Sequence, residues 1–241
     1  MKKINTLFAP LLFAASFSAQ ADILGGTVEA TYWQAGLSGH AAIGSDRVDA
    51  EDDLNFDDDS FFELAASIEH PVPIIPNVRL KYTDLDQTAT GNSSSDFENV
   101  NAGPVETNLD LSHFGALFYY EILDNWVSID LGLDIRKFDG QLKITGGGNE
   151  SLTDIDETLP LGYIAAEFAM PFTDMSAGAE ISAISYSGNS IHDAKIRIRQ
   201  GFSLAFIELG YRQLGIKLDY VSDLDVDLDL SGVYLSTGLD F

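Results

Sequence analysis

The chain ends with the stretch Val233-Tyr234-Leu235-Ser236-Thr237-Gly238-Leu239-Asp240-Phe241. Apolar residues or threonine occupy every second position of it, from Val233 to Phe241. A period of two places these side chains on one face of a β-strand. The stretch therefore predicts a terminal strand whose odd-numbered face lies against an apolar medium.

The first residues have the three parts of a secretory signal peptide. Lys2 and Lys3 form a basic start, residues 7–17 form a short apolar run, and Ala19-Gln20-Ala21 is a small-residue cleavage motif before Asp22. The apolar run is too short to cross a bilayer as a helix. We expect residues 1–21 to be a signal peptide and residues 22–241 to form one exported domain.

Charge and cysteine content exclude several classes of protein. Cleavage removes Lys2 and Lys3 and no acidic residue, so the formal net charge of −25 becomes −27. So acidic a chain is not expected to bind nucleic acid. The chain has no cysteine, which excludes disulfides, thiolate metal sites and a lipid-bearing cysteine. After the signal peptide no apolar run is long enough for a membrane-spanning helix.

Alternation recurs along the whole domain and predicts about ten β-strands, with eight as the second choice. The expected strands are residues 23–37, 61–70, 78–87, 107–121, 126–145, 155–170, 175–187, 191–201, 203–220 and 223–241. An even number of strands places both termini at the same rim, called rim A here. The opposite rim is called rim B.

The expected connections differ between the two rims. Rim A has short turns at 70–77, 123–125, 171–174 and 200–203. Rim B has three long polar loops, at 38–59, 88–105 and 146–154, and shorter turns at 188–190 and 221–224. This asymmetry is typical of outer-membrane barrels, in which the short turns are periplasmic. It favours a closed, antiparallel, up-and-down transmembrane β-barrel with both termini in the periplasm over a soluble β-sandwich.

Two strands change the phase of their alternation. In 126–145 the apolar set is odd-numbered up to Ile135 and even-numbered from Phe138 onward. In the terminal strand it is odd-numbered back to Val233 and even-numbered from Leu230 backward. One extra residue in a strand has this effect, so we expect a β-bulge at each change. The ladder of aspartates at 223, 225, 227 and 229 is expected near or beyond rim B.

The polar faces of the strands carry charges of both signs. The acidic set is Glu29, Glu63, Glu69, Asp130, Asp134, Glu167, Glu180 and Glu208, and the basic set is Arg79, Lys81, Arg136, Lys195, Arg197, Arg199 and Arg212. A ten-stranded barrel is narrow, and charges buried in it must be paired. We therefore predict an ion-pair network inside the barrel.

Candidate catalytic and metal-binding residues lack a recognisable constellation. The histidines are His40, His70, His113 and His192, and His192 is followed by Asp193. The densest acidic run is Asp46, Asp49, Glu51, Asp52, Asp53, Asp57, Asp58 and Asp59, whose spacing does not match a calcium loop. A solvated acidic loop is the favoured interpretation, with Ca²⁺ or Mg²⁺ binding left open. We predict no catalytic, cofactor-binding or metal-binding residue and no cofactor.

Several segments together resemble a family of small Gram-negative outer-membrane β-barrel proteins that has a Gly-Gly pair near the mature N-terminus. They are Asp22-Ile23-Leu24-Gly25-Gly26, the proline-rich 69–77, Gly210-Tyr211-Arg212 and the terminal Phe241. The resemblance covers the mature chain and implies an outer-membrane barrel without an assigned activity. The terminal strand likewise resembles the end that barrel-insertion machinery reads.

The expected function follows from this class. We predict a non-enzymatic outer-membrane protein with a structural role or a binding role of its rim-B loops. The alternatives are a narrow passive channel for small or apolar solutes and a barrel enzyme that acts on lipid or peptide. The expected partners are outer-membrane lipid and lipopolysaccharide, and the barrel-assembly machinery through the strand ending at Phe241.

Overall fold

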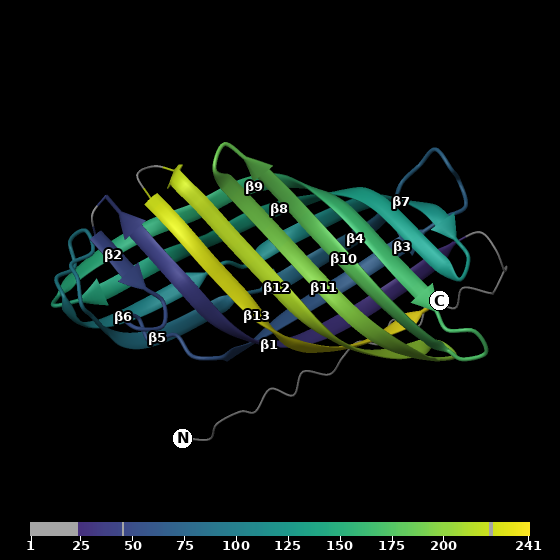
Figure 1. Cartoon of the computed structure of the whole chain (residues 1–241), viewed down its shortest axis with the longest axis horizontal. Helices are drawn as coiled ribbons and strands as arrows, with labels where there is room; N and C mark the ends of the chain where they lie inside the picture. Colours follow the sequence, from purple (N-terminus) through teal and green to yellow (C-terminus); the bar gives the residue numbers. More distant parts are fainter. Residues whose placement is uncertain (1–23, 45, 222–223) are drawn as a thin grey trace, which may run out of the picture.

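The computed structural model describes residues 24–44, 46–221 and 224–241, and they form a closed antiparallel β-barrel (Figure 1). The expected signal peptide, residues 1–21, lies outside the described residues. No helix in the described ranges is long and apolar enough to cross a membrane.

Around the barrel the wall has ten positions, each filled by one strand or by two strands that follow each other end to end. This confirms ten strands over eight. They are β1 (Gly25–Ile43), β3 (Asp59–Glu69), β4 and β5 (Asn77–Asp84 and Asp86–Ser93), β6 and β7 (Gly103–Asp110 and His113–Asp124), β8 (Val127–Gly146), β9 (Asn149–Ala169), β10 (Met175–Tyr186), β11 (Asn189–Phe202), β12 (Ala205–Val221) and β13 (Leu224–Asp240). β4 continues into β5 as one wall position, and β6 continues into β7 as another. Pairing of β1 with β13 and of β8 with β9 closes the ring.

Both ends of the described chain meet at rim A. Gly26 and Phe241 exchange two backbone hydrogen bonds, of 2.7 and 2.9 Å. A Cβ on Gly26 would lie 2.8 Å from the ring of Phe241, so a larger residue at this position would require the ring to move. In Figure 1 this rim is on the right, at the label C.

The loops at rim B are shorter than predicted, and the one expected at 146–154 is a tight turn. β1 continues to Ile43, and a short strand, β2 (Asp46–Asp49), folds back onto it in the region expected to be loop 38–59. β5 and β6 enter 88–105 from its two ends and occupy half of it, and β8 turns directly into β9 at Gly147-Gly148. The strands are therefore longer than expected, and they reach the left end of the barrel in Figure 1, where β2, β5 and β6 lie.

Neither predicted bulge is present. β8 pairs with β9 without interruption from Val127 to Gly146. β13 pairs with β1 without interruption from Leu224 to Asp240, and Gly232 lies in regular register opposite Ala35. The phase change in the sequence is a change in the chemistry of each face, because the strand itself does not slip.

The side chains on the inward face change from polar to apolar along a strand, as β8 and β12 show. Even-numbered residues of β8 point inward along its whole length, and they change from Asp134 and Arg136 to Phe138 and Leu142. The inward residues of β12 change in the same way, from Glu208 and Arg212 to Leu214 and Ile216. The interior is therefore polar in the half next to rim A and apolar in the half next to rim B.

The outward face has the opposite arrangement. In the rim-A half it carries exposed apolar side chains that form a belt, including Val28, Tyr32, Phe62, Leu64, Leu80, Tyr82, Phe114, Phe118, Leu131, Leu133, Ile164, Ile196, Ile198, Ile207, Leu209, Tyr211, Val233, Leu235 and Leu239. On β13 this belt begins at Val233, so it matches the ~9–11 residues with which a strand crosses a bilayer. In the rim-B half the same face of β13 carries Asp225, Asp227 and Asp229, which confirms that this ladder lies toward rim B. Asp223 lies outside the described residues.

Candidate functional site

An ion-pair network fills the rim-A half of the barrel, as the sequence predicts. We call its most buried part the plug. The plug consists of Glu63, Lys81, Asp134, Arg136, Glu180, Asp193, Lys195, Arg197, Glu208 and Arg212. These side chains come from β3, β4, β8, β10, β11 and β12 and meet across the lumen.

The upper layer of the plug joins opposite walls through two arginines. Arg212 of β12 donates two hydrogen bonds to Asp193, of 2.9 and 2.8 Å, and one of 3.0 Å to Glu63 of β3. Arg136 of β8 lies 2.8 Å from both Asp193 and Asp134. Both guanidinium groups are 1% exposed, so the lumen is closed at this level.

A lower layer continues toward rim A. Arg197 pairs with Glu180 at 3.1 Å and Glu167 at 2.8 Å, and Arg199 pairs with Glu208 at 2.9 Å. An open, water-filled lumen would leave Arg197 and Arg199 unpaired. Both have carboxylate partners, so this part of the lumen is filled. The prediction of internal ion pairing is confirmed, and buried charges need such pairing to remain ionised.

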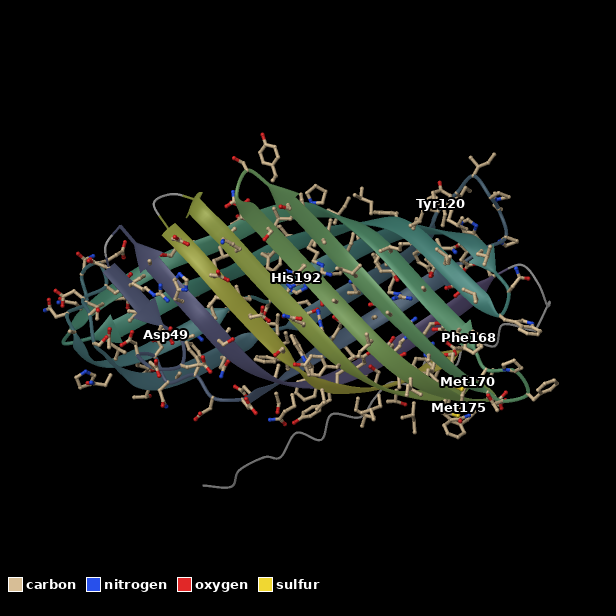
Figure 2. The ribbon with its side chains drawn as sticks, in the orientation of Figure 1. Asp49, Tyr120, Phe168, Met170, Met175 and His192 are labelled. Carbon is tan, nitrogen blue, oxygen red and sulfur yellow. The ribbon has the colours of Figure 1, made fainter. Side chains whose placement is uncertain are left out.

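Asp193 belongs to the plug, although the sequence places it beside His192 as part of a candidate rim site. Successive residues of a strand point to opposite faces. Asp193 therefore points into the lumen, whereas His192 points outward, where it contacts the position of Gly215 on β12. The two do not form a dyad, and Figure 2 shows His192 about midway along the wall.

The other histidines are dispersed. His113 is buried, with Nδ1 3.0 Å from the carbonyl oxygen of Leu111 and its ring against Phe138. His70 lies in the proline-rich turn at rim A, where its Nε2 is 3.3 Å from the carbonyl oxygen of Pro76. His40 lies near rim B and is paired with Asp49 and Asp227 in the strand register. The structure brings no two of them together.

An apolar cavity of about 250 Å³ lies inside the rim-B half, directly above the plug. It is the feature that sequence reasoning missed. Its apolar lining residues are Leu37, Ala41, Ala50, Leu54, Phe56, Leu109, Leu111, Phe138, Leu142, Ile155, Leu159, Ile191, Ile216, Leu218, Val226 and Leu228. Thr153, Glu157 and Asn189 are the polar residues in the same lining.

Trp33 lies between the two halves of the interior. It is 1% exposed and belongs to the same apolar cluster as the cavity lining. The guanidinium carbon of Arg212 lies 4.6 Å from the centre of its ring. Trp33 therefore joins the top of the plug to the apolar cluster.

The acidic run 46–59 forms part of the barrel wall. Residues 50–58, which we call the strap, follow β2 and place Ala50, Leu54 and Phe56 in the cavity lining. Glu51, Asp52, Asp57 and Asp58 are exposed on its outer side. The interspersed apolar residues were the signal that this run is more than a solvated loop.

Asp53 is the exception among the acidic residues of the strap, because it is buried. Its carboxylate accepts hydrogen bonds of 2.9 Å from the backbone N–H groups of both Asp49 and Ser94. Burial raises the pKa of Asp53, but hydrogen bonds from Ser94 and Asp49 outweigh it, and the pKa lies below its usual value. Within the described ranges no group of three or more His, Cys, Asp or Glu residues is placed to hold a metal ion.

Comparison with known proteins identifies the fold. The translocator domain of the autotransporter NalP from Neisseria meningitidis matches with a TM-score of 0.50 and 14% identity, over 90% of this chain and 88% of that one. The outer membrane protease OmpT from Escherichia coli matches with a TM-score of 0.49 and 8% identity, over 94% and 99%. Ail, the attachment invasion locus protein of Yersinia pestis, matches with a TM-score of 0.39 and 12% identity, over 91% and 99%.

No protein-family model matches the chain, and no curated protein matches its sequence. At these identities the structural likeness shows the fold alone, which is that of a Gram-negative outer-membrane β-barrel. The apolar belt of the rim-A half is the surface that such a barrel presents to lipid.

Proposed function

We propose that this protein is a non-enzymatic outer-membrane barrel that binds a small apolar molecule in the cavity of its rim-B half. Rim A would lie in the periplasm and rim B outside the cell. The observation that carries the proposal is an apolar cavity in a barrel that is closed beneath it by ion pairs.

The cavity fits a ligand of hydrocarbon character. Its volume of about 250 Å³ exceeds the ~150 Å³ of an apolar protein cavity that stays dry and binds benzene. Transfer of an apolar molecule from water into such a site gains ~25 cal/mol for each Å² of surface removed from water. Thr153 and Glu157 are polar residues of the lining that could orient one polar end of the ligand.

The plug distinguishes this proposal from a channel that runs the length of the barrel. A solute on the axis would have to separate Arg212 and Arg136 from Asp193, where each ion pair is 2.8 Å long and buried. Breaking a buried ion pair costs ~3–5 kcal/mol. Passage of apolar solutes along the whole axis is therefore the weaker alternative.

The structure bears differently on the other expected roles, which are an enzyme, binding through the rim-B loops, and contact with lipopolysaccharide or the assembly machinery. A barrel enzyme is disfavoured by the opposite orientation of His192 and Asp193. Binding through long rim-B loops is weakened because strands occupy half of 38–59 and of 88–105 and most of 146–154. We retain lipopolysaccharide and the barrel-assembly machinery as proposed partners, the latter because the terminal strand is regular up to Asp240 and pairs with β1.

Fluorescence of Trp33 tests the proposal. The chain has two tryptophans, and Trp126→Phe removes the one that is exposed at rim A. In that background we expect 1-bromooctane, an apolar probe with a quenching bromine, to quench Trp33 in a saturable manner in detergent micelles.

A matched pair of variants locates the binding. Ala41→Phe places a ring in the cavity and is expected to weaken saturable quenching by about tenfold or more, equivalent to ~1.4 kcal/mol. Gln213→Phe places the same ring on the exposed outer face and is expected to leave quenching unchanged. Quenching that does not saturate, or that responds equally to both variants, would refute binding in the cavity.

A further inference from the structure

The wall of the rim-B half has a break in its β-ladder beside the cavity. On its β3 side, β1 pairs with β3 from Gly25 to Ala35 and with β2 from His40 to Ile43. Residues 36–39 fall between these two registers. The strap lies alongside them, and we call this junction the seam.

The strap is held mainly at its ends and on its far side. The N–H of Ala50 donates to the carbonyl of Gly39 at 2.9 Å, at the upper end of the seam. On the far side, the side chain of Gln87 on β5 donates to the carbonyl of Asp57 at 2.7 Å, and Ser94 donates to Asp53. In a regular wall each neighbouring strand would be bonded along its length. The seam therefore lacks the continuous backbone bonding of a regular wall, as does the far side of the strap, where β5 pairs with β6.

A groove lies on the outer surface at the same place. It is lined by Gln34, Gly36, Leu37, Ser38, Glu51, Phe56, Asp57, Asp58, Tyr211, Ser231, Gly232 and Val233. Leu37 and Phe56 also line the cavity. One layer of residues at the seam therefore separates the external groove from the cavity.

The groove meets the edge of the lipid-facing belt. Val233 and Tyr211 are outward-facing and exposed, and they are the residues at which the belt ends on β13 and β12. Leu37 is paired with Leu230, only a few positions beyond Val233 on the same strand. A molecule dissolved in the adjoining leaflet would reach the groove without entering bulk water.

We propose that the seam is a lateral gate, through which an apolar molecule passes between the outer leaflet and the cavity. This inference rests on the proposed function, because it needs a ligand in the cavity and rim B outside the cell. The occupant is a membrane-dissolved hydrocarbon that fits the cavity. Movement of the strap away from residues 36–39 opens the gate, and Leu37 and Phe56 close it.

A disulfide across the seam tests the gate directly, because the chain has no other cysteine. In Asp58→Cys the sulfur takes the place of Cγ, which lies 3.7 Å from a Cβ built on Gly36, so the double variant Gly36→Cys with Asp58→Cys places two thiols across the seam. The control is Asp139→Cys with Asp156→Cys, an exposed pair that is directly opposed in the register of β8 and β9. Both are made in the Trp126→Phe background, so that Trp33 is the reporter.

The rate of Trp33 quenching by 1-bromooctane is measured in proteovesicles by rapid mixing. The oxidised seam variant is expected to be quenched about tenfold more slowly than its dithiothreitol-reduced form, with the same final extent. Asp53→Ala, which releases the strap from Ser94, is expected to accelerate quenching. A Trp33→Phe protein, in which Trp126 reports arrival of the probe in the bilayer, sets the rate of partitioning.

The outcomes separate the gate from the proposed binding. An unchanged rate in the oxidised seam variant, with saturable binding intact, would overturn the gate and point to entry through the mouth at rim B. Equal slowing by the control disulfide would also overturn it. Absence of saturable quenching in the parent protein would instead refute the cavity as a binding site.

Discussion

The rim-A and rim-B halves of this barrel use the same ten strands, but they place polar and apolar side chains on opposite faces of the wall. In the rim-A half, Arg212 points inward and Tyr211 points outward. In the rim-B half, Leu230 points inward and Asp229 points outward. The first half is built as a membrane barrel and the second as a water-exposed barrel with an apolar core.

This difference shows what each environment demands of an identical backbone. Lipid requires an apolar exterior, so the interior receives the charges, and these must pair because they are buried. Water accepts the aspartates of β13, which leaves the interior free to be apolar. The cavity arises in the half where the interior is apolar, above the plug that closes the other half.

The largest expected effect comes from removing a charge of the plug. Arg212→Leu removes two hydrogen bonds to Asp193 and one to Glu63. Because this leaves buried carboxylates with fewer partners, we expect a loss of ~3–5 kcal/mol in the free energy of unfolding. Urea titration read by heat-modifiable gel mobility measures it.

The matched variant for this prediction lies on the outside of the same barrel. Lys137→Ala removes the exposed partner of Asp156 and is expected to cost less than ~1 kcal/mol. Equal losses in Arg212→Leu and Lys137→Ala would mean that the plug is solvated, and the contrast between interior and exterior would fail.

The next effect concerns the boundary between the two outer faces. Leu235→Lys places a charge in the lipid-facing belt, and we expect a loss of ~2–4 kcal/mol in vesicles. Asp229→Lys lies on the same face of the same strand beyond the belt, and we expect a change within ~0.5 kcal/mol. Similar losses at both positions would show that the membrane covers the rim-B half as well.

The smallest effect is expected at an exposed ion pair of the rim-B half. Lys143 and Glu150 are 2.8 Å apart and both are substantially exposed. Lys143→Gln should cost ~0–1 kcal/mol at low salt and nothing measurable near 1 M salt, where the screening length is ~3 Å. A loss that persists at high salt would indicate that this half is less open to water than its outer surface implies.

The alternation in the sequence was sufficient to predict the strands and their number. Val127 to Ile135 alternate cleanly, and the structure places the odd residues outward and the even residues inward. The predicted interior charges do lie on the inner face, because a charge in phase with Gly132 and Ser128 shares their face. Asp193 was missed because its neighbour His192 suggested a rim site.

The phase changes had two physical explanations that one strand cannot distinguish. A bulge would keep the apolar set on one face, whereas a change of surroundings would keep the strand regular. The pairing of β8 with β9 and of β13 with β1 is continuous through the change, which excludes the bulges. The same reversal occurs in β11, β12 and β13, which are neighbours in the wall, and in β8, which β9 and β10 separate from them.

The strap illustrates the same limit. The eight acidic residues of 46–59 predicted a solvated loop, and Leu54 and Phe56 had no visible partner in the local sequence. Their partners come from strands far along the chain, such as Leu142 of β8 and Leu228 of β13. Because residues from many strands line the cavity, no local pattern in the sequence predicts it.

The alternation, the ten strands, the pairing of opposite charges in the interior and the apolar terminal face ending at Phe241 could all be predicted from the order of the residues. These are local or compositional properties, and a period of two carries them. The tertiary structure decided where the wall passes from lipid to water, which half is sealed, and that the acidic strap closes the wall beside the cavity. Those properties depend on register across strands distant in the chain, because a side chain's surroundings are set by its neighbours in space.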